Sequence, residues 1–293
     1  MSESILTIRN EKLTVQVNQY GAGLWSVKDA EGTEYLWQGD PKYWEDRSPI
    51  LFPYIARLTD GKYILDGKEY QMDIHGFAKD SMFEVTKQSE DEIVFRLTDT
   101  ENTYAQYPYH FVFEVNYKIE GNRLDVTFHV ENKDSKTMYF GVGGHPGFNV
   151  PLQEDEKFED YYLEFLGAGV ARKELFSDDC FVLGKTEDFP LEEGKKLLLK
   201  HDLFDNDAII LSSMPKQVVL RSKTGNKAVS VSYPDMDYLG LWHWPKTDAP
   251  YICIEPWSSL PSRKDIVEDL AKQQNLRKLS IRESIDIHWS IEI

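Results

Sequence analysis

A single histidine, His145, stands in the segment G-G-H-P-G, between two glycines and a proline. Glycine permits backbone conformations that other residues avoid, and proline fixes φ and removes a backbone donor. The segment therefore predicts a rigid turn that holds the imidazole in one direction. A histidine held in this way suits proton transfer or ligand binding, although a loop histidine bonded to the backbone is the commoner case.

Three further polar side chains stand in apolar or glycine-rich surroundings. Glu255 follows the apolar run Y-I-C-I, and because Pro256 comes next we expect the strand to end there, with Glu255 at its rim. Partial loss of water at a rim raises the pKa of a carboxyl toward that of a useful general base. His75, in D-I-H-G-F-A, suits a structural role or a site role. Arg57 is the lone charge after P-I-L-F-P-Y-I-A, and it suits either a salt bridge or a fork of donors for hydroxyl or carboxylate oxygens.

Aromatic residues are dense around these positions. Trp242, Trp244 and Trp257 flank Glu255, and Phe148 follows His145 closely. Aromatic rings stack on the C–H faces of sugars, but they more often fill the core. The residues alone thus predict a cleft for an uncharged ligand and do not name a reaction.

Several classes of function lack their signatures. The sequence has no G-x-G-x-x-G, G-x-x-x-x-G-K-[ST], H-E-x-x-H or G-x-S-x-G motif, which argues against standard nucleotide loops and zinc-peptidase chemistry. Thirty-three basic against 50 acidic residues give a net charge of −17, which argues against nucleic acid and anionic membranes as partners. No apolar run approaches the roughly 18 residues of a membrane span, and the N-terminus does not resemble a signal peptide. We expect a soluble cytoplasmic protein in which Cys180 and Cys253 are free thiols.

Apolar and polar residues alternate along most of the chain, which predicts half-buried strands. The clearest runs are residues 13–17, 93–97, 111–117 and 124–130, and turn segments such as D-G-K and E-G-N separate the strand-like stretches. Short strands joined by such turns predict an antiparallel, all-β fold. We find no repeat or linker and expect one domain over residues 1–293.

Helical signals are few. The segment 262–274 resembles a helix because Ser262 and Asp265 could form a capping box before a narrow apolar stripe. A second candidate helix covers residues 157–165. We expect the charged stretch 185–200 to be a solvated loop.

Four segments together resemble the aldose 1-epimerase, or galactose mutarotase, family. They are P-I-L-F-P-Y-I-A-R-L-T-D-G-K-Y (49–63), D-I-H-G-F-A (73–78), G-G-H-P-G-F-N-V-P-L (143–152) and Y-I-C-I-E-P-W (251–257). They follow the family's order over nearly the whole chain, and the sequence is most similar to the bacterial branch found with lactose and tagatose operons. Gly147 replaces an aromatic residue of the family's usual H-P-Y-F-N motif, which bears on substrate preference more than on chemistry.

The resemblance implies a large antiparallel β-sandwich with an open cleft for a monosaccharide, and no metal or organic cofactor. The family's general base falls on Glu255 and its general acid on His145, while His75 and Arg57 would hold sugar hydroxyls. The family also binds the sugar with an aspartate, and the matching stretch is F-D-N-D-A-I-I-L. Alignment on the apolar triplet places Asn206 opposite that aspartate, and of its neighbours Asp205 and Asp207 we favour Asp207.

The reaction implied is the exchange of α and β anomers of an aldohexose such as galactose or glucose. A base takes the proton of the C1 hydroxyl while an acid protonates the ring oxygen, and after rotation about C1–C2 the two groups exchange roles. An unperturbed histidine pKa of about 6.5 suits the acid, and a partly desolvated glutamate suits the base.

Three alternatives stay open. A hexose-6-phosphate mutarotase would need basic residues for the phosphate, for which Arg47, Arg172 and Arg263 are available. A non-catalytic sugar-binding or sensing protein would keep the cleft, although it would not need an acid–base pair. A carbohydrate lyase or hydrolase on a related sandwich would need paired carboxylates or a tyrosine–histidine set. The sequence leaves monomer and homodimer equally open.

Overall fold

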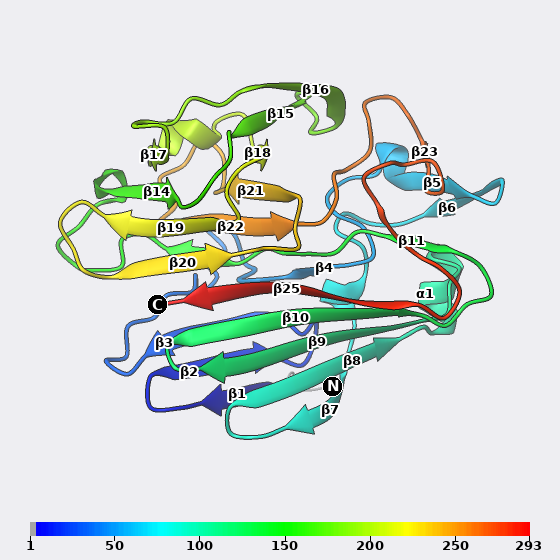
Figure 1. Cartoon of the computed structure of the whole chain (residues 1–293), viewed down its shortest axis with the longest axis horizontal. Coiled ribbons are helices and arrows are strands. Elements are labelled where there is room, and N and C mark those ends of the chain that lie inside the picture. The colour runs from blue at the N-terminus through cyan, green and yellow to red at the C-terminus, as the bar shows by residue number, and fades with distance from the viewer. Residues whose placement is uncertain (1–3) are drawn as a thin grey trace.

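Two large antiparallel sheets dominate the computed structural model, which describes residues 4–293 (Figure 1). The larger sheet has nine strands in the order β17-β14-β19-β20-β25-β10-β9-β8-β7. Their bounds are β7 Glu84–Gln88, β8 Glu92–Thr98, β9 Phe111–Glu120, β10 Arg123–Asn132, β14 Tyr161–Phe165, β17 Lys196–Leu198, β19 Gln217–Ser222, β20 Ala228–Ser232 and β25 Ser284–Glu292. Figure 1 shows the last strand, β25, between β20 and β10, so the C-terminal segment joins the two halves of this sheet.

The second sheet runs in the order β16-β15-β18-β21-β22-β12-β4, and β13 also pairs with β22. Its strands are β4 Ile50–Leu51, β12 Gly143–Gly144, β13 Gly147–Asn149, β15 Arg172–Phe176, β16 Val182–Asp188, β18 Ile209–Ser212, β21 Tyr238–Trp242 and β22 Tyr251–Trp257. Three small sheets complete the fold, with strands β1 Ile5–Arg9, β2 Leu13–Asn18 and β3 Leu24–Asp29, then β11 Met138–Phe140 and β24 Arg277–Leu279, and finally β5 Lys62–Leu65, β6 Lys68–Gln71 and β23 Glu268–Asp269.

The strands predicted from alternation are confirmed as β2, β8, β9 and β10. Along β9 and β10 the apolar side chains are buried and their neighbours are half-buried, as expected for strands with one face on a core. Glu120 pairs with Arg123 across the predicted E-G-N turn. Gly121 has a φ of 63° there, which suits glycine in a two-residue hairpin.

The hydrophobic core lies between the two sheets. Phe52, directly after β4, stacks on Phe113 of β9 with ring centroids 4.2 Å apart. Phe148 of β13 and Trp289 of β25 are buried in the same cluster, so Phe148 belongs to the core. This packing fixes the second sheet, which carries the candidate site, against the nine-stranded sheet.

The predicted helix over 262–274 is wrong. The segment forms turns and the short strand β23, because its polar side chains find tertiary partners instead of helix caps. Ser262 Oγ lies 3.3 Å from Tyr54 Oη, and the Ser262 N–H donates to the carbonyl of Arg57 at 3.0 Å. Within the segment, Glu268, only 2% exposed, accepts hydrogen bonds from the side chain of Arg263. Backbone pairing of β23 with β5 completes the segment.

Two other expectations also need correction. Residues 157–165 contain only the 3₁₀ turn η3 Phe158–Asp160 before β14, and the charged stretch 185–200 contributes to β16 and β17. The α-helix of the described chain is α1 Glu101–Gln106, which begins at the capping residue Thr100. Further 3₁₀ turns are η1 Thr59–Gly61, η2 Ala78–Asp80 and η4 His201–Phe204.

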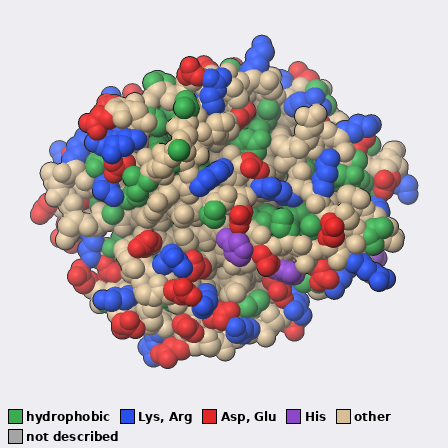
Figure 2. All heavy atoms as spheres, viewed as in Figure 1, with side chains coloured by type: hydrophobic (Ala, Val, Ile, Leu, Met, Phe, Trp, Pro, Cys, Tyr) green, Lys and Arg blue, Asp and Glu red, His purple; other side chains and the backbone are tan. Residues whose placement is uncertain are grey.

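Charged side chains of both signs are interspersed over the face drawn in Figure 2. Many charged side chains of the described chain pair at the surface, for example Arg123 with Asp125 at 2.9 Å. Cys180 and Cys253 are free thiols, as predicted. None of the helices formed by residues 4–293 is long and apolar enough to span a membrane.

Candidate active site

Glu255 lies in the middle of the second sheet, not at a rim as we expected. β22 continues through Pro256 to Trp257, because it pairs with β21 on one side and with β12 and β13 on the other. The side chain of Glu255 is therefore 1% exposed. Its neighbour across the sheet is Gly240, whose missing side chain leaves space beside the carboxyl-bearing chain.

His145 faces Glu255 because the strands on either side of it both pair with β22. Gly143 pairs with Trp257 and Gly147 pairs with Cys253, so the turn between them lies opposite Glu255. The glycines are needed for close approach and not for an unusual φ. A Cβ on Gly143 would lie 2.7 Å from a carbonyl oxygen of β22, and a Cβ on the next residue would lie 2.8 Å from the indole of Trp289.

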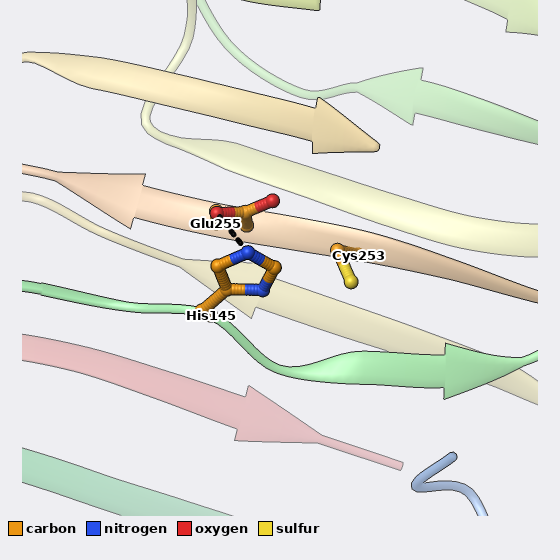
Figure 3. A group of neighbouring side chains, drawn as sticks. All are labelled: His145, Cys253 and Glu255. Carbon is orange, nitrogen blue, oxygen red and sulfur yellow. Dashed lines mark ion pairs between the residues drawn. The ribbon is translucent and has the colours of Figure 1, made fainter. Parts of the chain in front are cut away.

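His145 and Glu255 are in direct contact, as Figure 3 shows. Nε2 of His145 lies 3.2 Å from Oε2 of Glu255, and Trp257 donates its Nε1–H to the same oxygen at 3.2 Å. Nδ1 of His145 is buried and has no hydrogen-bond partner among the described residues. The imidazole therefore directs one nitrogen at a carboxyl group inside a nearly water-free site.

Burial shifts the pKa values of both members of this pair. It raises the pKa of Glu255 well above its ordinary value and lowers the pKa of His145 to about 4. The negative charge of Asp207 opposes the shift at His145 and adds to the shift at Glu255. The expectation of an unperturbed histidine pKa near 6.5 is thus wrong, because the imidazole is buried. Both shifts disfavour charge and allow one proton to be shared between the two groups.

His75 lies beside this pair, with its ring centroid 5.5 Å from that of His145. The segments around residues 52–57 and 72–78 bond to each other, and the backbone N–H of Ala56 donates to Nδ1 of His75 at 3.1 Å. A Cβ on Gly76 would overlap the carbonyl oxygen of Phe52, so a glycine at this position lets the two segments approach closely enough to bond. The bond to Nδ1 leaves the proton of the neutral imidazole on Nε2, where it can be donated to a ligand.

Arg57 ends the segment 52–57 and has an exposed side chain. It forms no ion pair with any acidic residue between positions 4 and 293, so the predicted alternative of a salt bridge is not observed. Its positive charge lowers the pKa of His75 and of Cys180, which places the guanidinium near both side chains. A guanidinium with no ion pair among the described residues can bind hydroxyl oxygens.

Asp207 follows η4 and precedes β18, with a φ of 74°. Its Oδ1 accepts the N–H of Ala208 at 2.8 Å, and its Oδ2 accepts the thiol of Cys180 at 3.1 Å. Its negative charge raises the pKa of His145 and of Glu255. The charge of Asp205 instead raises the pKa of His243, and the side chain of Asn206 is exposed. Of the three candidates in this stretch, Asp207 is the one whose charge reaches the acid–base pair.

Trp44 was missed by the sequence analysis. Its ring centroid lies 4.9 Å from that of His145 and 5.5 Å from that of Trp242. Cζ3 of Trp44 would be 3.1 Å from a Cβ on Gly147, so the indole occupies space that a larger residue 147 would need. The absence of an aromatic residue at position 147 was the available signal. Trp244, by contrast, is 45% exposed and meets Trp242 at 6.0 Å.

Three side chains of the site could act as metal ligands. His145, Cys253 and Glu255 are all buried, and one ligand atom of each lies within 4.8 Å of the others. Cys253 and Glu255 are two residues apart on β22 and so share a face (Figure 3). Burial raises the pKa of the Cys253 thiol well above its ordinary value, which disfavours the thiolate that a metal requires.

We therefore expect the activity of this site not to require a metal. Protein treated with a chelator and then passed into metal-free buffer should retain its rate of sugar anomer exchange, because proton transfer by a histidine and a carboxylate needs no metal. The rate would be compared with that of untreated protein and of treated protein supplied with Zn²⁺. A loss that Zn²⁺ restores would contradict this expectation.

Comparisons with known proteins show the family to which the chain belongs. The sequence profile described as aldose 1-epimerase matches residues 4–268. Protein LacX of Lactococcus lactis subsp. lactis is 35% identical over 275 residues, covering 90% of this chain and 92% of LacX. The galactose mutarotase related enzyme of Lactobacillus acidophilus has a TM-score of 0.93 at 34% identity and covers 99% of this chain and 97% of its own. A galactose mutarotase-like protein of Lactobacillus casei has a TM-score of 0.93 at 31% sequence identity, and the match covers 99% of each chain.

Proposed function

Because the chain belongs to the aldose 1-epimerase family, we propose that it is a mutarotase that interconverts the α and β anomers of a free aldohexose. The observation that carries the proposal is the direct, buried contact of His145 Nε2 with Glu255 Oε2 at 3.2 Å. His75 lies beside His145, the charge of Asp207 raises the pKa of both members of the pair, and the charge of Arg57 lowers the pKa of His75. We assign these three side chains as the donors and the acceptor for sugar hydroxyls.

The mechanism needs one acid and one base on the two sides of the C1–ring oxygen bond. A sugar that enters between His145 and Glu255 replaces their contact with one hydrogen bond to each. With the shared proton on His145 and Glu255 ionised, Glu255 takes the proton of the C1 hydroxyl while His145 protonates the ring oxygen, and the C1–O5 bond opens. After rotation about C1–C2 the proton transfers run in reverse on the other face of C1. Because the pair shares one proton, each turnover returns it to its starting state.

The arginines considered for a phosphate are already engaged with other groups, which favours a free sugar over a sugar phosphate. The guanidinium of Arg47 donates to Trp25 O and Gln38 Oε1, each at 2.7 Å, and covers the Trp25 ring. The other two arginines considered for a phosphate are also engaged, Arg172 with Asp188 and Arg263 with Glu268. A phosphate would have to compete with each of these partners.

Exchange NMR tests this choice of substrate. With α-galactose, α-glucose and glucose-6-phosphate at equal concentration, we expect the protein to speed anomer exchange of the free sugars. The same spectra recorded without protein give the spontaneous rate. Acceleration of glucose-6-phosphate alone would overturn the assignment of a free sugar.

Arg57 is expected to contribute to sugar binding more than to proton transfer. Replacing Arg57 by alanine should weaken the affinity for galactose by roughly 10- to 100-fold, as expected for hydrogen bonds from a charged donor. Titration calorimetry measures this change, and Arg96→Ala is the matched control, because Arg96 lies on β8 and pairs with Glu114. An affinity equal to that of the wild type would remove Arg57 from the binding site.

A further inference from the structure

The tip of the β15–β16 hairpin reaches the candidate site. Residues 177–181 form a tight turn in which the Cys180 N–H donates to the Ser177 carbonyl at 2.8 Å and the Ser177 N–H donates to the Phe181 carbonyl at 2.9 Å. Cys180 has a φ of 67° at this tip. The turn is tied down at its side, because Lys264 forms an ion pair with Asp179. Cys180 is therefore held in place by the hairpin and by the neighbouring segment.

The thiol of Cys180 contacts one proposed sugar-binding residue, and a second acts on its pKa. Sγ lies 3.1 Å from Oδ2 of Asp207, and the positive charge of Arg57 lowers the pKa of the same thiol. The other carboxylate oxygen of Asp207 is held by the backbone N–H of Ala208 at 2.8 Å. Both oxygens of Asp207 thus have a donor, and the thiol is the side-chain donor that fixes the plane of the carboxylate.

We propose that Cys180 is a positioning residue of the active site, whose thiol orients the Asp207 carboxylate toward the sugar and toward the acid–base pair. This inference rests on the proposed mutarotase function. Cys180 does not touch the reacting atoms and acts through Asp207. Burial and the charge of Asp207 raise the pKa of the thiol to about 11, so it remains a donor throughout the neutral pH range.

The contact has two consequences for the reaction. A carboxylate that is already fixed accepts a hydrogen bond from a sugar hydroxyl without losing further conformational freedom. Cys180 therefore increases the affinity for the substrate. The charge of Asp207 also raises the pKa of His145 and of Glu255, so the orientation of its carboxylate shifts the pH range over which the pair is active. A thiol that only filled space would affect neither quantity in this manner.

The test compares Cys180→Ala, which removes the donor, with Cys180→Ser, which keeps one. We expect Cys180→Ala to raise the KM for galactose roughly three- to tenfold, the effect of one weak hydrogen bond, with kcat changing by less than about twofold. The pH profile of its kcat/KM should shift to lower pH than that of the wild type, because an Asp207 carboxylate that is no longer held in place raises the pKa values of His145 and Glu255 less. Cys180→Ser should restore both the KM and the profile.

The outcomes separate this inference from the proposed function. If the wild type epimerises galactose and Cys180→Ala has the same KM and pH profile, the positioning role is overturned while the mutarotase assignment stands. If Cys180→Ser is impaired as much as Cys180→Ala, the thiol acts through packing and the donor role is likewise overturned. If the wild type epimerises no aldose, the proposed function fails. Galactose binding measured by calorimetry on the same variants then still tests the role of Cys180.

Discussion

Replacing Glu255 by glutamine lowers kcat/KM for galactose by about 10²- to 10⁴-fold, the range for loss of a general acid–base group. Glutamine fills the same space between Gly240 and the turn of His145, and it can still accept the Nε1–H of Trp257. It cannot take the proton of the C1 hydroxyl. Polarimetry at matched protein concentration measures the loss. A variant with the wild-type rate would exclude Glu255 as the base.

The same substitution should not destabilise the fold, which separates a catalytic effect from a structural one. The folded-state pKa of Glu255 lies above its ordinary value of 4.5, so the buried carboxyl costs stability as pH rises from that value through the raised pKa. Glu255→Gln should therefore melt at or above the wild-type temperature at pH 7. Glu164→Gln is the opposite control, because Glu164 is paired with Lys195 at 2.7 Å and its pKa is lowered. Removing that charge should lower the melting temperature.

Replacing His145 by asparagine is expected to cost a similar factor of about 10² to 10⁴ in kcat. Asparagine can donate a hydrogen bond toward Glu255 but cannot exchange a proton with the ring oxygen of the sugar. His243→Asn is the matched control, because His243 is also fully buried with a pKa lowered to about 4, and its Nδ1 bonds to the carbonyl of Trp244. Stopped-flow polarimetry of both variants should show the loss only at position 145. Equal losses would point to a general effect of buried histidines.

The sequence predicted the all-β fold well because alternation is a local property. The runs in β8, β9 and β10 alternate without interruption, and each buries one face. The helix expected at 262–274 failed because tertiary bonds decide that segment. Its capping candidate Ser262 meets Tyr54 from a distant part of the chain, and the N–H of Leu270 donates to the carbonyl of Ile64.

The candidate site was predictable in its members but not in its electrostatics. The resemblance in four segments pointed to His145 and Glu255, which the structure brings into contact. The burial of Glu255 depends on strand partners on both sides of β22, which no single segment reveals. The lowered pKa of His145 follows from that burial. Cys180 and Trp44 reach the site from other parts of the chain, and only the fold brings the Cys180 thiol to Asp207.

Polarimetry of freshly dissolved α-D-galactose and α-D-glucose, with wild type and Glu255→Gln in parallel, tests the central claim most directly. We predict that the wild type speeds the decay of optical rotation above the spontaneous rate for at least one of these sugars, and that the variant does not. A wild-type decay equal to the spontaneous rate for both sugars would contradict the claim that the His145–Glu255 pair epimerises a free aldohexose.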